Sequence, residues 1–210
     1  FQAVQPGRLG LRGTTLRGFG GLLRVNPVRP IEVDVTESSL FLGRELARLE
    51  MPSSSLAMRS PILSMDVSRS NVVLGASAVI VEGGGERPVP DWLVRTTQSK
   101  WISWSGPGNC LVRLEGALIR KERLKDWWRG AENQFSNWAG GLEGSDAEFE
   151  PRILMSGEQW QETLGQEMGE WRELDMQKPP MKNEWATVTP SRIFGEDPAP
   201  SGEKVPEKTK

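Results

Sequence analysis

The segment Ile31-Glu32-Val33-Asp34-Val35 alternates strictly between aliphatic and acidic side chains. Successive side chains of a β-strand point to opposite faces, so this pattern predicts a strand with one apolar and one polar face. Further short apolar runs, separated by glycine, proline and serine, lie at 23–25, 62–67, 72–81, 92–94, 101–104 and 111–114. About seven short strands of this kind are typical of a β-sandwich or barrel. We therefore expect an antiparallel, sandwich-like or barrel-like β core over residues 22–119.

The pattern changes after residue 119, where apolar side chains recur at helical spacing. Two such stretches cover residues 120–139 and 156–175. Ser156 and Gln159 fit a capping box, which marks a helix N-terminus. Pro179 and Pro180 would end the second stretch, because proline cannot continue a helix. The sequence thus predicts an α+β protein in which two amphipathic helices follow the β core.

These patterns divide the chain into four parts. A basic, glycine-rich arm covers residues 1–21, the β core 22–119, and a helical, acidic region packed on the core 120–189. Residues 190–210 are rich in proline, glycine and charge. Such a segment buries too little apolar surface to offset its ordering entropy, so we expect a flexible tail. No internal repeat is evident.

The composition excludes many kinds of enzyme. The 210 residues contain no histidine, no tyrosine and one cysteine, Cys110. Serine–histidine and cysteine–histidine catalysis and histidine-based zinc sites are therefore excluded. Carboxylate pairs such as Glu32 and Asp34 are commonplace on an exposed strand, and the glycine runs lack the sequence context of phosphate loops. We expect no catalytic residues, no cofactor and no metal; an enzyme that uses carboxylates or lysine is the remaining alternative.

Charge is unevenly distributed although the net charge is only -2. Residues 1–31 contain five arginines and no acidic residue, whereas residues 141–210 contain 15 acidic and 8 basic residues. Arginine-rich, acid-free N-termini are typical of mitochondrial targeting regions, and a transit peptide or its remnant fits this pattern. A chance basic segment is the alternative. No apolar run approaches the roughly 20 residues that cross a bilayer. The candidate basic arm comprises Arg8, Arg12, Arg17, Arg24 and Arg29.

All nine tryptophans lie after residue 91. They could fill the core, because each indole buries a large apolar area. They could instead form a protein interface, or a stacking surface for single-stranded nucleic acid next to the basic residues at 120–129. The candidate partner-contact residues are Trp127, Trp128, Trp138, Trp160 and Trp171.

Three short motifs in residues 60–106 resemble a known family. They are Ser60-Pro61-Ile62, Asp91-Trp92-Leu93-Val94 and Trp101-Ile102-Ser103-Trp104-Ser105-Gly106. Their order resembles the fungal mitochondrial proteins of the "altered inheritance of mitochondria" family, whose fold is similar to that of the tryptophan RNA-binding attenuation protein. The resemblance implies a β-sheet protein of the mitochondrial inner membrane that supports membrane-organising and respiratory assemblies, without catalytic residues.

The sequence and the resemblance together lead to one expected function and one alternative. We expect a non-enzymatic mitochondrial structural or assembly factor, acting through protein–protein contacts at the inner membrane or in the matrix. Its partners would be protein subunits of a larger assembly. The alternative is an organellar ribosomal or RNA-associated subunit, in which the arginine-rich arm would contact phosphates.

Overall fold

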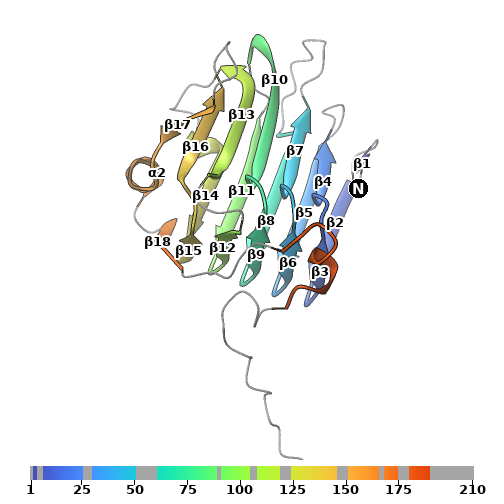
Figure 1. Ribbon diagram of the computed structural model, residues 1–210. Helices are drawn as coiled ribbons and strands as arrows, with labels where there is room; N and C mark the ends of the chain where they lie inside the picture. Colours follow the sequence, from blue (N-terminus) through green and yellow to red (C-terminus); the bar gives the residue numbers. More distant parts are fainter. Residues whose placement is uncertain are drawn as a thin grey trace, which may run out of the picture.

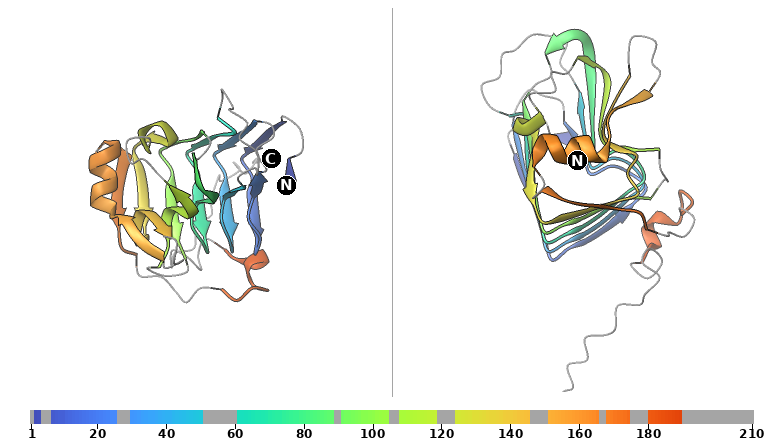
Figure 2. Two further views of the ribbon diagram at one scale, coloured as in Figure 1. Left: turned by 90° about the horizontal axis from the view of Figure 1, so that it is seen from above. Right: turned by 90° about the vertical axis from the view of Figure 1, so that its left-hand side faces the viewer.

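Almost all of the regular structure is β-strand. The computed structural model describes residues 2–3, 7–25, 30–50, 61–88, 91–104, 108–118, 124–145, 151–165, 168–174 and 180–189. The chain winds around a long axis as a β-solenoid with three sheets, which give it a triangular cross-section (Figures 1 and 2). Each rung, meaning one turn of the solenoid, contributes one strand to each sheet in turn.

The three sheets share one pattern of parallel pairing. Sheet A has the order β1 (Gln2–Ala3), β4 (Leu23–Val25), β7 (Ala47–Glu50), β10 (Val79–Pro88), β13 (Cys110–Leu118), β16 (Gly140–Ser145), β17 (Pro151–Met155). Sheet B has the order β14 (Trp128–Ala131), β11 (Trp92–Thr97), β8 (Leu63–Ser68), β5 (Ile31–Thr36), β2 (Gly7–Arg12). Sheet C has the order β18 (Gly169–Arg172), β15 (Asn133–Ser136), β12 (Lys100–Ser103), β9 (Asn71–Leu74), β6 (Ser39–Leu42), β3 (Thr15–Gly18). All neighbours are parallel except β16 and β17.

The expected antiparallel sandwich or barrel is wrong. Alternation of apolar and polar residues shows that a strand has one buried face, but it does not show which strand lies beside it. Here each strand is followed by a corner that leads into the next sheet, and it pairs with the strand one rung later. β5, for example, pairs with β2 on one side and β8 on the other. Neighbouring strands are therefore parallel and distant in sequence.

The two predicted helices are also wrong in extent. The first is only α1 (Leu124–Trp127), and the residues after it form β14 and β15. The second is α2 (Gly157–Leu164), which ends at Gly165 and is followed by β18. Its capping box is confirmed: the Ser156 hydroxyl accepts from the Gln159 N–H at 3.2 Å, and the Gln159 side chain accepts from the Ser156 N–H at 3.0 Å. All three sheets continue past residue 119, so the solenoid contains residues on both sides of that boundary.

The rungs reveal an internal repeat that the sequence analysis did not recognise. At the corner between sheets B and C, one residue of each rung adopts a left-handed conformation, with φ between 47° and 58°. These residues are Gly13, Glu37, Arg69, Gln98 and Glu132. Their spacings of 24, 32, 29 and 34 residues are irregular because the loops differ in length. No fixed sequence period exists for a repeat search to detect.

A ladder of buried hydrogen bonds follows this corner. From the second rung onwards, the residue after the left-handed position has a side-chain oxygen that accepts a hydrogen bond. The donor is the backbone N–H of the equivalent residue in the preceding rung. Ser70 Oγ accepts from the Ser38 N–H at 3.1 Å, and Ser99 Oγ accepts from the Ser70 N–H at 3.2 Å. Asn133 Oδ1 continues the series by accepting from the Ser99 N–H at 3.1 Å. The ladder satisfies corner N–H groups that burial removes from water.

The interior is filled by columns of stacked side chains, and in sheets B and C the largest of these side chains lie at the C-terminal end. One column of sheet B runs Leu9, Val33, Met65, Val94, Trp128. A column of sheet C runs Leu16, Leu40, Val72, Trp101, Phe135, Trp171. The N-terminal rungs are therefore aliphatic inside, and the C-terminal rungs are aromatic where sheets B and C line the interior. The inward side chains of sheet A stay aliphatic, from Leu23 to Leu142. One apolar core extends through the solenoid.

A second, smaller apolar cluster lies outside the solenoid, on the outer face of sheet C. The chain returns across this face after residue 180, and the short 3-10 helix η3 (Trp185–Thr187) lies near β3 (Figure 1). Trp185 meets the Trp104 ring edge-on at a centroid distance of 5.5 Å, and Val188 is fully buried. The returning segment thus covers apolar side chains that sheet C would otherwise expose. Within the described part of the chain, no helix has the length and hydropathy needed to cross a membrane.

Candidate functional site

The five tryptophans proposed as partner contacts lie at the C-terminal end of the solenoid. Trp127, Trp128, Trp138 and Trp160 belong to the buried core, with exposed fractions between 0% and 7%. Trp171 is half-buried and stacks on Phe135 at 5.3 Å. These rings pack against one another and against the sheets, as the core-filling alternative expects. Their proposed contact with a partner stays a prediction.

The nucleic-acid stacking surface considered at residues 120–129 is not formed by the residues that the structure describes. Lys125 and Arg129 are exposed, but the neighbouring rings of Trp127 and Trp128 point into the core. Arg129 is also engaged locally, because its Nε donates to the Lys125 carbonyl and it pairs with Asp126 at 3.7 Å. Residues 120, 121 and 123 lie outside the described residues.

The predicted basic arm is part of the solenoid. Residues 7–25 contain β2, β3 and β4, which we call the N-terminal rung. Arg8, Arg12 and Arg17 are exposed on its outer surface. Arg8 lies 3.9 Å from Asp34, and the Arg17 guanidinium lies 5.8 Å from the centroid of the Phe41 ring. Arg24 forms an ion pair with Glu50 that raises its pKa. The remaining member of the set, Arg29, lies outside the described residues.

The N-terminal rung leaves two sheet edges without a neighbour among the described residues. β2 is the last strand of sheet B, and β3 is the last strand of sheet C. Their inward side chains, Leu9, Leu11 and Leu16, are only half-buried, although the equivalent residues of the next rung are at most 2% exposed. An edge with unpaired backbone groups and apolar side chains can accept a further strand.

The opposite end of the solenoid is closed. α2 lies across it, as the right view of Figure 2 shows, and places Trp160 against the Trp128 ring at a centroid distance of 5.8 Å. The Gln161 side chain donates a hydrogen bond to the Gly169 carbonyl of β18, which fills one acceptor at the edge of sheet C. β14 and β18 are also the last strands of their sheets, so the two ends differ in how far their apolar interior is covered.

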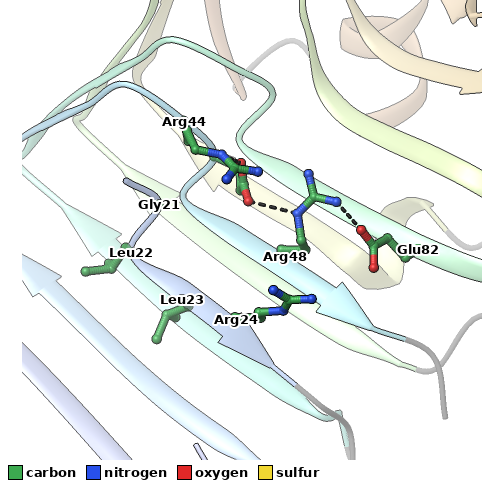
Figure 3. A pocket seen from close by; sticks show the side chains of 8 residues that line it. Gly21, Leu22, Leu23, Arg24, Arg44, Arg48 and Glu82 are labelled. Atoms are coloured by element: carbon green, nitrogen blue, oxygen red, sulfur yellow. Dashed lines mark hydrogen bonds and ion pairs between the residues drawn. The ribbon is translucent and has the colours of Figure 1, made fainter. Parts of the chain in front are cut away.

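A polar hollow of about 380 Å³ lies beside the N-terminal rung, near the corner where sheet C leads into sheet A (Figure 3). Its lining includes three arginines and two glutamates. Glu45 is only 5% exposed, accepts from Arg48 Nε at 2.8 Å and lies 3.3 Å from Arg44 Nε. Arg48 also pairs with Glu82. The full lining is Gly21, Leu22, Leu23, Arg24, Arg44, Glu45, Arg48 and Glu82.

The charges around the hollow hold each other in their ionised forms. Burial acts to raise the pKa of Glu45, but the hydrogen bond from Arg48 and the nearby guanidinium charges bring that pKa below its ordinary value. Burial opposes the charge of Arg48, but its hydrogen bonds to Glu45 and Glu82 raise its pKa. Neither group would exchange protons near neutral pH, so neither suits general acid–base catalysis. The ion pairs link Arg48 to Glu82 of the following rung. A backbone hydrogen bond joins the N-terminal rung to this corner, because the Glu45 carbonyl accepts from the Leu22 N–H at 3.3 Å.

Other candidate chemical groups lie apart. Cys110 is buried, and burial together with the nearby Glu143 raises the pKa of its thiol to about 12. Glu32 and Asp34 lie on the outer face of β5, where Asp34 accepts from the Thr36 hydroxyl at 2.7 Å. In the described ranges, no three histidine, cysteine, aspartate or glutamate side chains gather as metal ligands would.

The chain matches no family model, no curated protein and no solved structure in the comparisons made with them. The similarity of residues 60–106 to the "altered inheritance of mitochondria" family therefore stays a prediction. In that segment, Trp92, Trp101 and Trp104 are each at most 1% exposed.

The free edge of the N-terminal rung was not predicted from the sequence. The sequence did contain an alternating pattern there. Outward and inward residues alternate from Arg8 to Arg12, in register with the strand residues from Glu32 to Thr36. The six glycines in residues 7–21 masked that alternation, because glycine weakens a strand and is common in loops.

Proposed function

We propose that the chain is a non-enzymatic structural or assembly factor of mitochondria, acting through protein–protein contacts at the inner membrane. The observation that carries this proposal is the difference between the two ends of the solenoid. α2 covers the apolar interior at one end, whereas β2 and β3 have no outer neighbour among the described residues and lie next to half-buried leucines. Such edges are where folded proteins add strands from partners. The proposed mitochondrial location rests on the resemblance of residues 60–106 to a mitochondrial family.

An RNA-associated role is the second candidate. It is favoured by the exposed Arg8, Arg12 and Arg17, which lie in a segment without acidic residues. Phosphate contacts by arginine make binding strongly salt-dependent. RNA affinity that falls by about 20- to 40-fold between 50 and 200 mM salt, as expected for three phosphate contacts, would support this candidate. We expect no such affinity.

The assembly proposal can be tested by native separation of mitochondrial inner-membrane complexes. We expect the wild-type chain to migrate with a large assembly, and the variant Leu9→Asp/Leu11→Asp to migrate alone. Leu93→Asp is the matched control, because Leu93 lies on the outer face of β11 and is away from the free edges. A wild-type chain that migrates alone, or that sediments with ribosomes, would overturn the proposal. Circular dichroism of the purified variants tests whether they fold.

A further inference from the structure

β5 shows which kind of strand pairs with β2. It lies parallel to β2, with Leu9 opposite Val33 and Leu11 opposite Val35 on the inner face. On the outer face, Arg8 is opposite Glu32 and lies 3.9 Å from Asp34. Aliphatic residues on one face and acidic residues on the other therefore match β2 along one of its edges.

The other edge of β2 presents the same two faces. A strand added there would meet Leu9 and Leu11 inside, and Arg8 and Arg12 outside. Rungs of a solenoid repeat by stacking on their neighbours, so the side chains that suit one edge also suit the other. Both arginines are exposed, with 72% of the Arg8 side chain accessible to solvent, and Arg12 is opposite the uncharged Thr36.

The hydrogen-bond ladder has a vacant position at the same end. In the later rungs, the ladder hydroxyl donates a hydrogen bond to the backbone carbonyl two residues earlier. It also accepts a hydrogen bond from a backbone N–H of the preceding rung. Ser38 Oγ, for example, donates to the Thr36 carbonyl at 2.8 Å and accepts from the Thr14 N–H at 3.1 Å. The Thr14 hydroxyl donates to the Arg12 carbonyl at 3.0 Å, but no described residue donates to it. An added strand that continued around the corner would supply that N–H.

A second copy of this chain fits the edge less well. Residues 7–25 contain four arginines and no acidic residue. Two N-terminal rungs placed edge to edge would therefore bring arginine against arginine, and like charges on neighbouring strands are destabilising. The acidic outer face of an alternating strand removes that repulsion.

We propose that the N-terminal rung binds an extended segment of a partner protein, with alternating aliphatic and acidic residues, as an additional parallel strand on β2. This inference rests on the proposed function and specifies the partner segment. The segment would place aliphatic side chains on Leu9 and Leu11 and carboxylates next to Arg8 and Arg12. Backbone hydrogen bonds would supply affinity, and the alternation would supply specificity.

A synthetic peptide with the chain's own sequence at 30–38, blocked at both ends and carrying a fluorophore, is a suitable probe. We expect it to bind the full chain in anisotropy titrations, and to bind at least about tenfold more weakly when lysines replace its two strand acids, Glu32 and Asp34. Arg8→Gln/Arg12→Gln should weaken binding about fivefold. Arg129→Gln, an exposed arginine at the other edge of sheet B, should leave binding unchanged. Equal affinity for both peptides would overturn the proposal.

Cross-linking tests the site and the direction of the strand. In a Cys110→Ala background, Leu9→Cys should form a disulfide with a peptide whose cysteine replaces the counterpart of Val33. Leu11→Cys should prefer the counterpart of Val35, because the pairing is parallel. The reverse preference would overturn a parallel strand.

Two further outcomes separate this inference from the proposed function. If the peptide does not bind but the chain still migrates with a large mitochondrial assembly, the strand inference fails and the assembly proposal stands. If sedimentation shows a dimer that Leu9→Asp abolishes, a second copy occupies the edge and the strand inference is overturned. Tryptophan fluorescence in urea tests whether each variant keeps the wild-type fold.

Discussion

The two ends of the solenoid differ in what covers the last strands of the sheets and the apolar side chains beside them. Every solenoid must terminate a stack of strands whose next neighbour is missing. At the C-terminal end, α2 covers the last rung and Trp160 is fully buried. At the N-terminal end, no described strand covers the outer edges of β2 and β3, and exposed arginines lie next to half-buried leucines. The comparison predicts that the end covered by α2 contributes more stability, and it supports the proposal that the open end binds a partner.

Removing the two terminal apolar contacts should show the largest difference. Trp160→Ala should lower the free energy of unfolding by about 3–5 kcal/mol, because it empties a fully buried site. Leu16→Ala at the open end should cost about 1 kcal/mol, because part of its area is already exposed. Urea denaturation measures both. Equal costs at the two ends would contradict the contrast drawn here.

Two strand glycines at opposite edges of sheet B make a sharper pair. A Cβ added at Gly130 would collide with the Thr96 carbonyl oxygen and lie 2.9 Å from Thr96 Cγ2. Gly130→Ala should therefore cost about 2–3 kcal/mol through overpacking. At Gly10 on β2, a Cβ would meet no atom within 4 Å. Gly10→Ala should change stability by less than about 0.5 kcal/mol. A large cost at Gly10 would mean that the free edge is covered.

The ladder of buried hydrogen bonds at the corner between sheets B and C runs from Thr14 to Asn133. A substitution at Ser70 interrupts it in its middle. Ser70 is 2% exposed, and Ser70→Ala leaves the Ser38 N–H without its acceptor. We expect a loss of about 1–3 kcal/mol, the usual effect of an unsatisfied buried donor. Ser68→Ala, two residues earlier on the outer face, should cost about 0.5 kcal/mol or less. Similar urea midpoints for the two variants would show that the ladder contributes little.

The sequence predicted individual strands better than their arrangement. The alternation at 31–35 identified β5, and Ser156 with Gln159 identified the start of α2. The parallel pairing was not predictable from these patterns, because strand alternation is the same in parallel and antiparallel sheets. Recognition of the repeat required noticing that Thr36-Glu37-Ser38, Ser68-Arg69-Ser70 and Thr97-Gln98-Ser99 occupy the same corner.

The aromatic residues misled the helix prediction for a related reason. Helical spacing is shared by four aromatic residues, Trp127, Trp128, Phe135 and Trp138. They nevertheless lie in different elements: the first in α1, the second in β14, the third in β15 and the last just after β15. At a corner the chain turns from one sheet into the next, and the inward side chains on both sides of the turn point into the same core. The sequence spacing of these apolar residues is therefore set by the turn and can match that of a helix. Helical periodicity over a few residues cannot distinguish this case from an amphipathic helix.

The smallest effect concerns the ion cluster of Arg44, Glu45, Arg48 and Glu82, which lies beside the open end. The pKa of Glu45 is lower in the folded chain than the ordinary value of a glutamate carboxyl group, because Arg48 and Arg44 stabilise the ionised form. A lowered folded pKa means that ionised Glu45 stabilises the fold above the unfolded pKa, and that this stabilisation is lost as the pH falls from that value through the folded pKa. Wild-type stability should therefore decrease more steeply below about pH 5 than that of Glu45→Gln, which carries no titrating group at this position.

Urea midpoints measured between pH 7 and pH 3 test this difference. At pH 7 the Glu45→Gln variant should be the less stable protein, because Arg44 and Arg48 lose their shared carboxylate while the variant amide still accepts one hydrogen bond. The two curves should approach each other as the wild-type carboxylate becomes protonated. Parallel curves would mean that the guanidinium groups gain nothing from Glu45 in the folded state. In that case strand pairing and apolar packing, together with the backbone bond from Leu22 to Glu45, account for the stability of this corner.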